Sequence, residues 1–245
     1  MDKKLIIFDL DGTLVDSMTG FGDIAASVLS YFHSCEPAWA KAQYKATSGL
    51  PFPQQLEQIF PQHPSNRLAA ALFDELKRKS YFQAPFYNDV FEALAILKVE
   101  GYQLAVSSNN DDDLVYKKIG YNRDLFDWIL GFKPDFSKGQ DHFEALQVSA
   151  NCSKEDMLFI GDSFHDARLA EEFGIDFIGR AGTFSPLDWN ANVPSAKLID
   201  NMGQLVQMLA HAPSAQNIDS EISIEKSHFG CWDGHPLGIP DGGLA

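Results

Sequence analysis

Two aspartates, Asp9 and Asp11, directly follow a short apolar run near the start of the chain, residues 5–8. Carboxylates this close repel each other unless a cation or a proton lies between them. The run has the composition of a buried strand, so both acids are expected at the carboxyl end of that strand. The pattern predicts chemistry that depends on a bound cation.

Polar residues that could take part in chemistry also stand at the ends of other apolar runs. One ends in Ser107 and Ser108, and another ends in Asp162, with Asp166 four residues further on. Ligands of an open parallel sheet bind beyond the carboxyl ends of its strands, so one rim would collect four carboxylates. Magnesium suits such a rim, because it binds a few protein oxygens and leaves open positions for water and phosphate.

These residue types favour phosphoryl transfer. Asp9 could attack phosphorus as a carboxylate nucleophile and form an aspartyl-phosphate. Asp11 could protonate the leaving oxygen and later take a proton from the attacking water. Ser107 and Lys138 offer a hydroxyl and an ammonium for the charge on the transferring group.

The elements that must position these residues are visible as apolar runs and helix-period segments. Near-continuous apolar runs, typical of parallel strands covered on both faces, lie at 5–8, 102–108, 126–132, 157–162, 175–179 and 196–200. Helix-period segments lie between most of them, at 88–101, 111–120, 141–150, 166–175 and 201–210. This alternation predicts an α/β fold with a doubly wound, Rossmann-like parallel sheet.

The segment 18–84 breaks the alternation, because it shows only helical patterns, punctuated by Gly49 and several prolines. It predicts an all-helical cap inserted into an α/β catalytic core made of residues 1–17 and 85–212. Residues 213–245 lose periodicity and gain Gly, Pro and polar residues. They are interpreted as a partly ordered tail of unassigned role.

Composition limits the partners. Thirty-four acidic against nineteen basic residues give a formal charge of −15, which disfavours binding to nucleic acid or to an anionic membrane. The first apolar run is too short for a signal peptide or a membrane span. The three cysteines are far apart and odd in number, which predicts reduced thiols. A cytoplasmic protein with a small-molecule substrate is expected.

Four motifs occur in an order that resembles a known family. They are DLDGT at 9–13, the strand-end Ser107, Lys138, and GDSFHD at 161–166. On these motifs, and over roughly residues 3–209, the chain resembles the haloacid dehalogenase-like phosphohydrolases. The helical insert is similar to the cap of the branch that includes phosphoglycolate phosphatases and beta-phosphoglucomutase.

The resemblance implies roles for individual residues. Asp9 would be the nucleophile and Asp11 the general acid/base, with Asp9, Asp162 and the main-chain carbonyl of Asp11 as Mg²⁺ ligands. Asp166 would support the metal site. The side chains that bind the substrate phosphate would be Ser107, Ser108 and Lys138. The second aspartate disfavours the dehalogenase branch, which lacks it.

Several positions have competing interpretations. Lys133, which precedes a proline, competes with Lys138, but Lys138 better fits the start of the helix that precedes Asp162. Ser108 and Asn109 could equally cap the next helix. DLDG is also a fragment of calcium loops, although an apolar strand precedes it here and the twelfth position is not glutamate. In the tail, His228, Cys231 and His235 are a weak candidate for a zinc site.

The sequence thus favours a magnesium-dependent phosphatase that hydrolyses a small phosphorylated metabolite through an aspartyl-phosphate. One alternative is a phosphomutase of the beta-phosphoglucomutase type, for which Lys41, Lys45 and Arg67 are the basic candidates in the cap. Another is a receiver-like regulatory module that only accepts a phosphoryl group. The helical insert speaks against the receiver, which carries no such cap.

Overall fold

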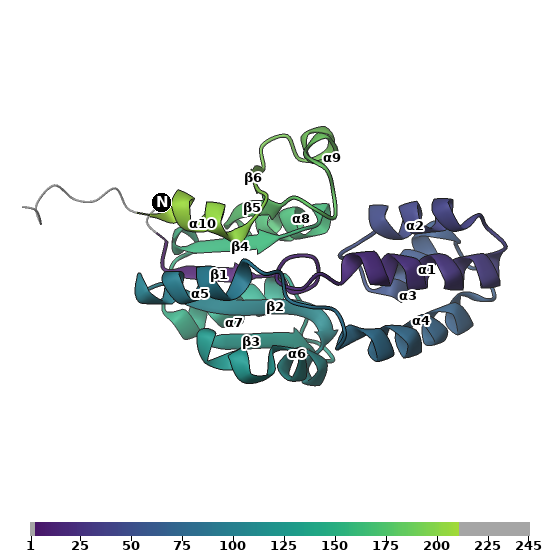
Figure 1. Ribbon diagram of the computed structural model, residues 1–245, viewed down its shortest axis with the longest axis horizontal. Helices are drawn as coiled ribbons and strands as arrows, with labels where there is room; N and C mark the ends of the chain where they lie inside the picture. The colour runs from purple at the N-terminus through teal and green to yellow at the C-terminus, as the bar shows by residue number, and fades with distance from the viewer. Residues whose placement is uncertain (1–2, 211–245) are drawn as a thin grey trace, which may run out of the picture. The chain divides into compact units, whose positions relative to one another are not determined.

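The computed structural model describes residues 3–210, which form a parallel sheet, the helices around it and a group of helices inserted after the first strand (Figure 1). The tail 213–245 and its candidate zinc ligands lie outside the described residues. The strands are β1 (Leu5–Phe8), β2 (Gln103–Asp111), β3 (Trp128–Phe132), β4 (Met157–Gly161), β5 (Asp176–Arg180) and β6 (Lys197–Ile199). The helices are α1 (Met18–His33), α2 (Pro37–Ala46), α3 (Phe52–Ile59), α4 (Asn66–Tyr81), α5 (Val90–Val99), α6 (Asp112–Ile119), α7 (Gln140–Ala150), α8 (Phe164–Phe173), α9 (Pro186–Asn192) and α10 (Met202–Leu209).

The six strands run parallel in the order β3-β2-β1-β4-β5-β6. Phe8 at the end of β1 lies beside Val106 of β2 and Ile160 of β4, so the polar residues that follow β1 and β4 come out beside the serines of β2. The chain order reverses beside β1, which is the place where such sheets bind ligands. The predicted doubly wound α/β fold is confirmed.

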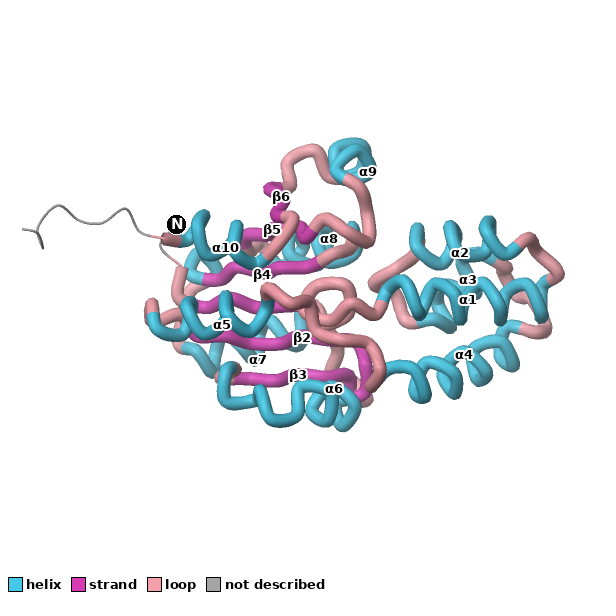
Figure 2. The backbone as a smooth tube through the Cα atoms, in the orientation of Figure 1, coloured by secondary structure: helices cyan, strands magenta, loops and turns pink. Residues whose placement is uncertain are grey.

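Alternate residues of the strands face two separate layers of helices. Ile6 and Phe8 belong to the apolar cluster that includes α5, α6 and α10, whereas Leu5 and Ile7 pack with α7 and α8. All four side chains are fully buried. Covering both faces explains why the strands read as continuous apolar runs, and Figure 2 shows the sheet between its two layers.

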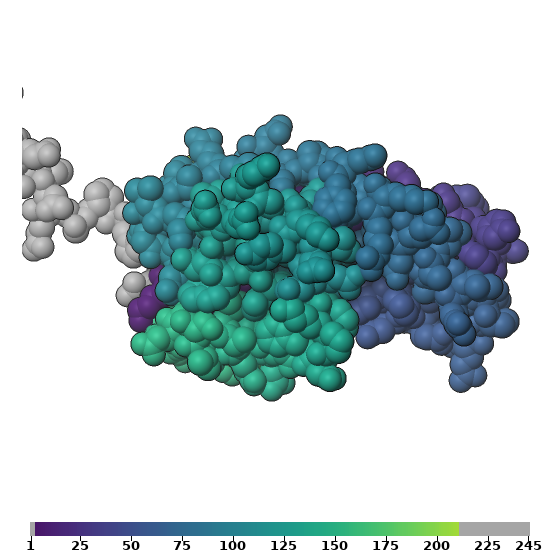
Figure 3. Space-filling view, turned by 90° about the horizontal axis from the view of Figure 1, so that it is seen from below, coloured from purple at the N-terminus to yellow at the C-terminus, as the bar shows by residue number. Residues whose placement is uncertain are grey.

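Helices α1 to α4 all lie between β1 and β2 in the chain and pack on one another beyond the carboxyl ends of the strands (Figures 1 and 2). Their interior is aromatic: the rings of Phe52 and Phe73 stack with centroids 3.8 Å apart, and Tyr44 packs against both. In the space-filling view these purple and blue helices abut the teal part of the chain (Figure 3). Within residues 3–210 no helix has the length and hydrophobicity of a membrane span.

Helix α9 has no counterpart among the expected helices. It begins with a capping box in which Ser185 Oγ accepts from the Asp188 amide at 3.2 Å, with Pro186 at its first position. Trp189 is buried and packs its ring against Phe164 and Phe184. The S-x-x-D signal with a proline at the first helical position is readable in the sequence, but the helix is too short to show an apolar period.

Candidate active site

Asp9 is the first residue after β1 and lies at the carboxyl edge of the sheet. Its amide donates to Ile160 O at 2.9 Å, which extends the β1–β4 ladder by one step and orients the side chain. Only 4% of the residue is exposed. It lines a cavity of about 290 Å³ that also reaches the helices of the insert.

Lys138 lies directly against Asp9. The residue comes just before α7, and its Nζ lies 2.8 Å from Asp9 Oδ1 and 2.6 Å from Asp166 Oδ1. Burial disfavours the charged lysine, but Asp166 and Asp9 outweigh burial and raise the pKa of Lys138 overall. The side chain is therefore an ammonium at neutral pH.

Asp162 follows β4 and faces the turn after β1. Gly12 in that turn has φ +82°, and a Cβ built there would overlap the Asp162 carboxylate. Any other residue at position 12 would be strained and would displace this carboxylate. Thr183, in the loop after β5, donates its hydroxyl to Asp162 Oδ2. The glycine of DLDG is thus required by the close approach of Asp162 in the GDSFHD motif.

Asp166 is oriented by the start of α8. Ser163 caps this helix: its Oγ accepts from the Asp166 amide at 3.1 Å, and Asp166 Oδ2 accepts from the Ser163 hydroxyl at 2.6 Å. This capping box holds one carboxylate oxygen on the helix end. The other oxygen, Oδ1, is left to bind Lys138.

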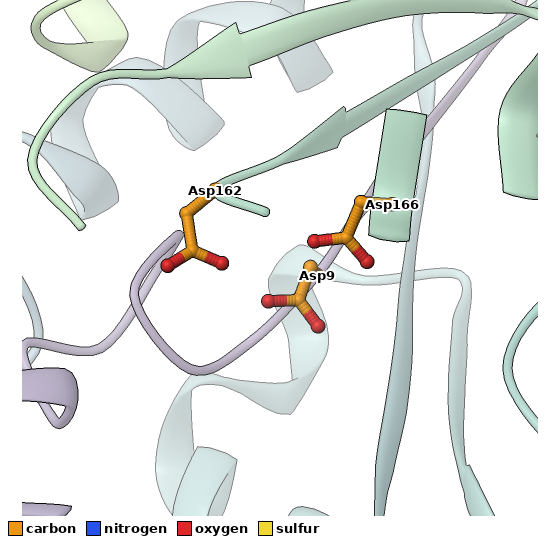
Figure 4. A group of neighbouring side chains, drawn as sticks. All are labelled: Asp9, Asp162 and Asp166. Atoms are coloured by element: carbon orange, nitrogen blue, oxygen red, sulfur yellow. The ribbon is translucent and has the colours of Figure 1, made fainter. Parts of the chain in front are cut away.

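Asp9, Asp162 and Asp166 form a group of buried carboxylates whose oxygens lie within 4.8 Å of one another, and Figure 4 shows them converging. With all three ionised, three negative charges face the one positive charge of Lys138. Burial raises the pKa of Asp9 to about 7, although Lys138 acts in the opposite direction. Burial also raises the pKa of Asp162, with Asp9 and Asp166 adding to the effect.

This arrangement fits a hard divalent cation. The group resists full ionisation by itself, so a cation would favour the ionised form of its carboxylates. The donors are all oxygen atoms, which suits Mg²⁺. The side chain of Asp11 is not part of this group, and its predicted contribution is a main-chain carbonyl.

Asp11 lines the same cavity, with its carboxylate held by two donors. Ser17 Oγ donates to Asp11 Oδ1 at 2.6 Å, and Asn110 Nδ2 donates to Asp11 Oδ2. Asn110 also reaches the insert, because its Nδ2 donates to Tyr81 OH at 3.1 Å. One side chain at the end of β2 therefore links Asp11 to helix α4.

The two serines of β2 lie in different surroundings. Ser107 is fully buried, and its Oγ lies 2.9 Å from His142 Nδ1 on helix α7. Ser108 lines the cavity, whereas Ser107 is not among the residues that line it. Neighbouring residues of a strand point to opposite faces, so the structure places Ser108 at the site and Ser107 beneath it.

The two candidate lysines are also separated. Lys133 pairs with Asp112 at 3.1 Å, and its side chain is 54% exposed. Lys138 is the lysine that contacts Asp9. Asn109 helps to place it, since its Oδ1 accepts from the Lys138 amide at 3.1 Å. The cap residue of α6 is Asp111, and not Ser108 or Asn109.

The loop 47–51 of the insert enters the site. Gly49 and Pro51 line the cavity, and the carbonyl of Gly49 accepts from Asn109 Nδ2 at 3.4 Å. Gly49 has φ +93°, and a Cβ there would lie 2.7 Å from both His165 Cβ and Ser163 Oγ. The loop therefore lies tightly against the turn that carries Asp162 and Asp166.

Some residues at this site carry no prediction from the sequence. They are Ser17, Thr183, Asn110 and Lys77, of which Asn110 and Lys77 line the cavity and Ser17 and Thr183 bind its acids. Thr183 and Asn110 follow the rule that the rim is built from the ends of parallel strands, so that rule applied to every strand would have found them. Ser17 and Lys77 have no such signal.

Residues 6–180 match the model of the haloacid dehalogenase-like hydrolase family. The match extends over more than half of the chain, and the chain belongs to this family. The resemblance predicted from the four motifs is confirmed.

Curated relatives support the enzyme class. The chain is 28% identical over 225 residues to the protein named "Probable phosphatase IndB" of Dickeya dadantii, covering 86% of this chain and 94% of the relative. It is 28% identical over 185 residues to phosphoglycolate phosphatase 1 of Pseudomonas aeruginosa, covering 70% and 67%. The predicted class, a phosphatase of the haloacid dehalogenase-like superfamily, is confirmed.

A solved structure shows the same fold. The haloacid dehalogenase-like hydrolase family protein from Streptococcus pneumoniae superposes with a TM-score of 0.72 at 20% identity, covering 85% of this chain and 99% of that chain.

Proposed function

We propose that the protein is a magnesium-dependent phosphatase that hydrolyses a small phosphorylated metabolite through an aspartyl-phosphate on Asp9. The observation that carries this proposal is the buried group of Asp9, Asp162 and Asp166, with Lys138 bonded to Asp9, at the wall of one cavity. The family and the phosphoglycolate phosphatase among the relatives support the reaction class.

The first half-reaction transfers the phosphoryl group to Asp9. A carboxylate oxygen of Asp9 attacks phosphorus, and the bond from phosphorus to the leaving oxygen breaks. Asp11 donates a proton to that oxygen, so the alcohol leaves neutral. Lys138 and Ser108 lie where they can donate to the phosphoryl oxygens as charge develops there.

The second half-reaction regenerates the enzyme. Asp11, now ionised, takes a proton from a water molecule as that water attacks the phosphorus of the aspartyl-phosphate. The bond between phosphorus and Asp9 breaks, which releases inorganic phosphate. The helices of the insert form the other wall of the cavity, which limits access of bulk water.

Asp9, Asp162 and the carbonyl of Asp11 would hold the magnesium ion, and Asp166 would support the site. When bound, Mg²⁺ supplies positive charge that lets the anionic substrate approach an anionic nucleophile.

The two alternatives are less well supported by the structure. None of the cap cations proposed for a phosphomutase lines the cavity: Lys41 pairs with Asp23, and Lys45 lies over the ring of Phe184. The four helices of the insert are present, and these are what the receiver-like alternative lacks. A phosphatase in the cytoplasm stays our proposal.

Phosphate release from p-nitrophenyl phosphate and from a panel of small phosphate esters tests the proposal. We expect turnover that requires magnesium, stops with a chelator and is lost in Asp9→Asn. Lys79→Met, which removes an exposed lysine that pairs with Glu75 and does not line the cavity, serves as the control and should retain turnover. Release that persists in Asp9→Asn, or that ignores the chelator, would contradict the mechanism.

A further inference from the structure

We propose that Lys77 selects substrates that carry a second anionic group, such as a carboxylate, besides the phosphate that is transferred. The inference rests on the phosphatase function proposed above, because it assigns the remainder of the same cavity. Lys77 lies near the end of α4 and lines the cavity together with Asp9 and Lys138.

Among the described residues, three cationic side chains line this cavity: Lys77, Arg78 and Lys138. Two of them are already paired with carboxylates. Lys138 bonds Asp9, and Arg78 lies 2.6 Å from an oxygen of Asp111. Among residues 3–210 no carboxylate lies within 4.0 Å of the Lys77 ammonium. Lys77 is therefore the cation of the cavity that remains for an anionic ligand.

The groups around Lys77 shield its ammonium from part of the solvent without neutralising its positive charge. Its Nζ donates to Asn110 Oδ1 at 2.6 Å and lies 4.9 Å from the centroid of the Phe21 ring. The amide is neutral, and the aromatic face withdraws the ammonium from part of its water. A ligand anion would thus meet a partly desolvated cation that has no carboxylate partner. Hydrogen bonds between such charged groups are strong.

Asn110 also limits the distance between the second anionic group of the substrate and the phosphate that is transferred. The same amide that accepts from Lys77 donates to Asp11, the proposed general acid/base. One side chain therefore separates the ammonium from the residue that protonates the leaving oxygen. The cavity of about 290 Å³ lies at the small end of ligand sites. Both observations favour an ester with few carbon atoms between phosphate and anion.

Asp74, one turn before Lys77, is the opposing charge at this end of the cavity. Burial raises the pKa of Asp74, while Lys77 and Arg78 act to lower it. A substrate with a cationic tail would bind Asp74 instead. The ammonium of Lys77, and not this carboxylate, is linked to Asp11 through the Asn110 amide, so an anionic tail is favoured.

The test compares two esters that differ only at the proposed contact. In ethyl phosphate a methyl group replaces the carboxylate of 2-phosphoglycolate. The measured quantity is the ratio of kcat/KM for 2-phosphoglycolate to kcat/KM for ethyl phosphate, in the full chain with magnesium. We expect wild type to prefer 2-phosphoglycolate and Lys77→Met to lower the ratio about tenfold or more, chiefly through KM.

Two variants serve as controls. Lys77→Arg keeps the charge and should keep the ratio within about threefold. Lys79→Met removes a lysine from the same helix that instead pairs with Glu75 at 2.6 Å and does not line the cavity, so its ratio should equal that of wild type.

The outcomes separate this inference from the function on which it rests. A ratio unchanged in Lys77→Met, or a wild type without a preference for the carboxylate ester, overturns the role of Lys77. Turnover of p-nitrophenyl phosphate by wild type in the same experiment leaves the phosphatase function standing. If wild type hydrolyses none of the phosphate esters, both proposals fail.

Discussion

The ammonium of Lys138 lies 2.8 Å from Asp9 Oδ1, and both side chains are almost completely buried. Lys138 also bonds Asp166, so it is the positive charge among three converging carboxylates. The same contact has two consequences. It stabilises buried acids that would otherwise repel one another, and it places a donor at the carboxylate proposed to attack phosphorus.

Replacing Lys138 should therefore affect both stability and activity. In a chelator, Lys138→Met should lower the free energy of unfolding by about 3–5 kcal/mol, the cost of leaving buried charges without their partner. Magnesium should reduce that loss by neutralising the same carboxylates. Turnover should fall about 10²–10³-fold. Urea denaturation and phosphate release measure the two effects.

Lys133→Met is the matched control for this variant. Its salt bridge with Asp112 is exposed, so its loss should change stability by less than about 1 kcal/mol and leave turnover intact. Equal losses of activity in the two variants would argue against Lys138 as the phosphate-binding lysine.

Asp11→Asn should separate the two half-reactions. A nitrophenolate leaves without protonation, so Asp9 can still be phosphorylated by p-nitrophenyl phosphate, whereas hydrolysis of the intermediate loses its base. We expect kcat to fall about 10²–10⁴-fold and labelled phosphate to accumulate on the protein. Acid quench of a reaction with ³²P-labelled substrate measures the accumulation. A variant that loses turnover without retaining label would contradict the second role of Asp11.

His142 should make stability fall at acidic pH. Burial lowers the pKa of this histidine from 6.5 to about 4 in the folded chain. Above pH 6.5 neither the folded nor the unfolded state binds the proton, so stability is independent of this group. Between pH 6.5 and 4 the unfolded state gains the proton first, and the free energy of unfolding decreases, by about 3 kcal/mol in all.

His142→Gln isolates this contribution from that of other titrating groups. Between pH 6.5 and 4 the free energy of unfolding of the variant should decrease less steeply than that of wild type. Glutamine keeps a polar partner for Ser107, whose Oγ lies 2.9 Å from His142 Nδ1. Urea denaturation at several pH values gives the two curves. Parallel curves over this range would show that His142 ionises normally in the folded protein.

Gly49→Ala should disturb the loop that enters the active site. The backbone there has φ +93°, and the new Cβ would lie 2.7 Å from atoms of Ser163 and His165. We expect a loss of about 1–3 kcal/mol in stability and a lower kcat/KM, because the loop must withdraw from the Asp162 turn. Thermal denaturation and p-nitrophenyl phosphate turnover measure both.

Gly20→Ala is the contrasting substitution. Gly20 lies inside α1, and nothing lies within 4 Å of a Cβ built on it. Alanine should stabilise that helix by about 0.5–1 kcal/mol without loss of activity. If both alanine variants had the same stability and turnover, the close approach of Gly49 to Ser163 and His165 would not be important for activity.

Much of the fold could be predicted because parallel strands covered on both faces must be apolar throughout. The runs at Leu5–Phe8 and Met157–Gly161 carry that pattern, and each is followed directly by an acid that lies at the same edge of the sheet. Helix α9 escaped prediction, because it is too short for an apolar period and its capping signal stands in a loop-like stretch.

Other features of the site depended on directions and distances that the order of residues does not contain. Ser107 and Ser108 cannot be distinguished in the sequence, but alternation along β2 directs Ser107 toward His142 and Ser108 toward the cavity. Asn110 and Lys77 belong to segments separated by 33 positions in the chain, and only folding brings their atoms within 2.6 Å.

The sequence by itself determined the family, the parallel sheet and the acids at its edge, because these follow from local patterns of apolar and acidic residues. The tertiary structure decided which serine and which lysine face Asp9, how the acids are held, and which cation of the cavity has no carboxylate partner among the described residues. These depend on side-chain direction and on contacts between distant segments, which arise only when the helices pack against the ends of the strands.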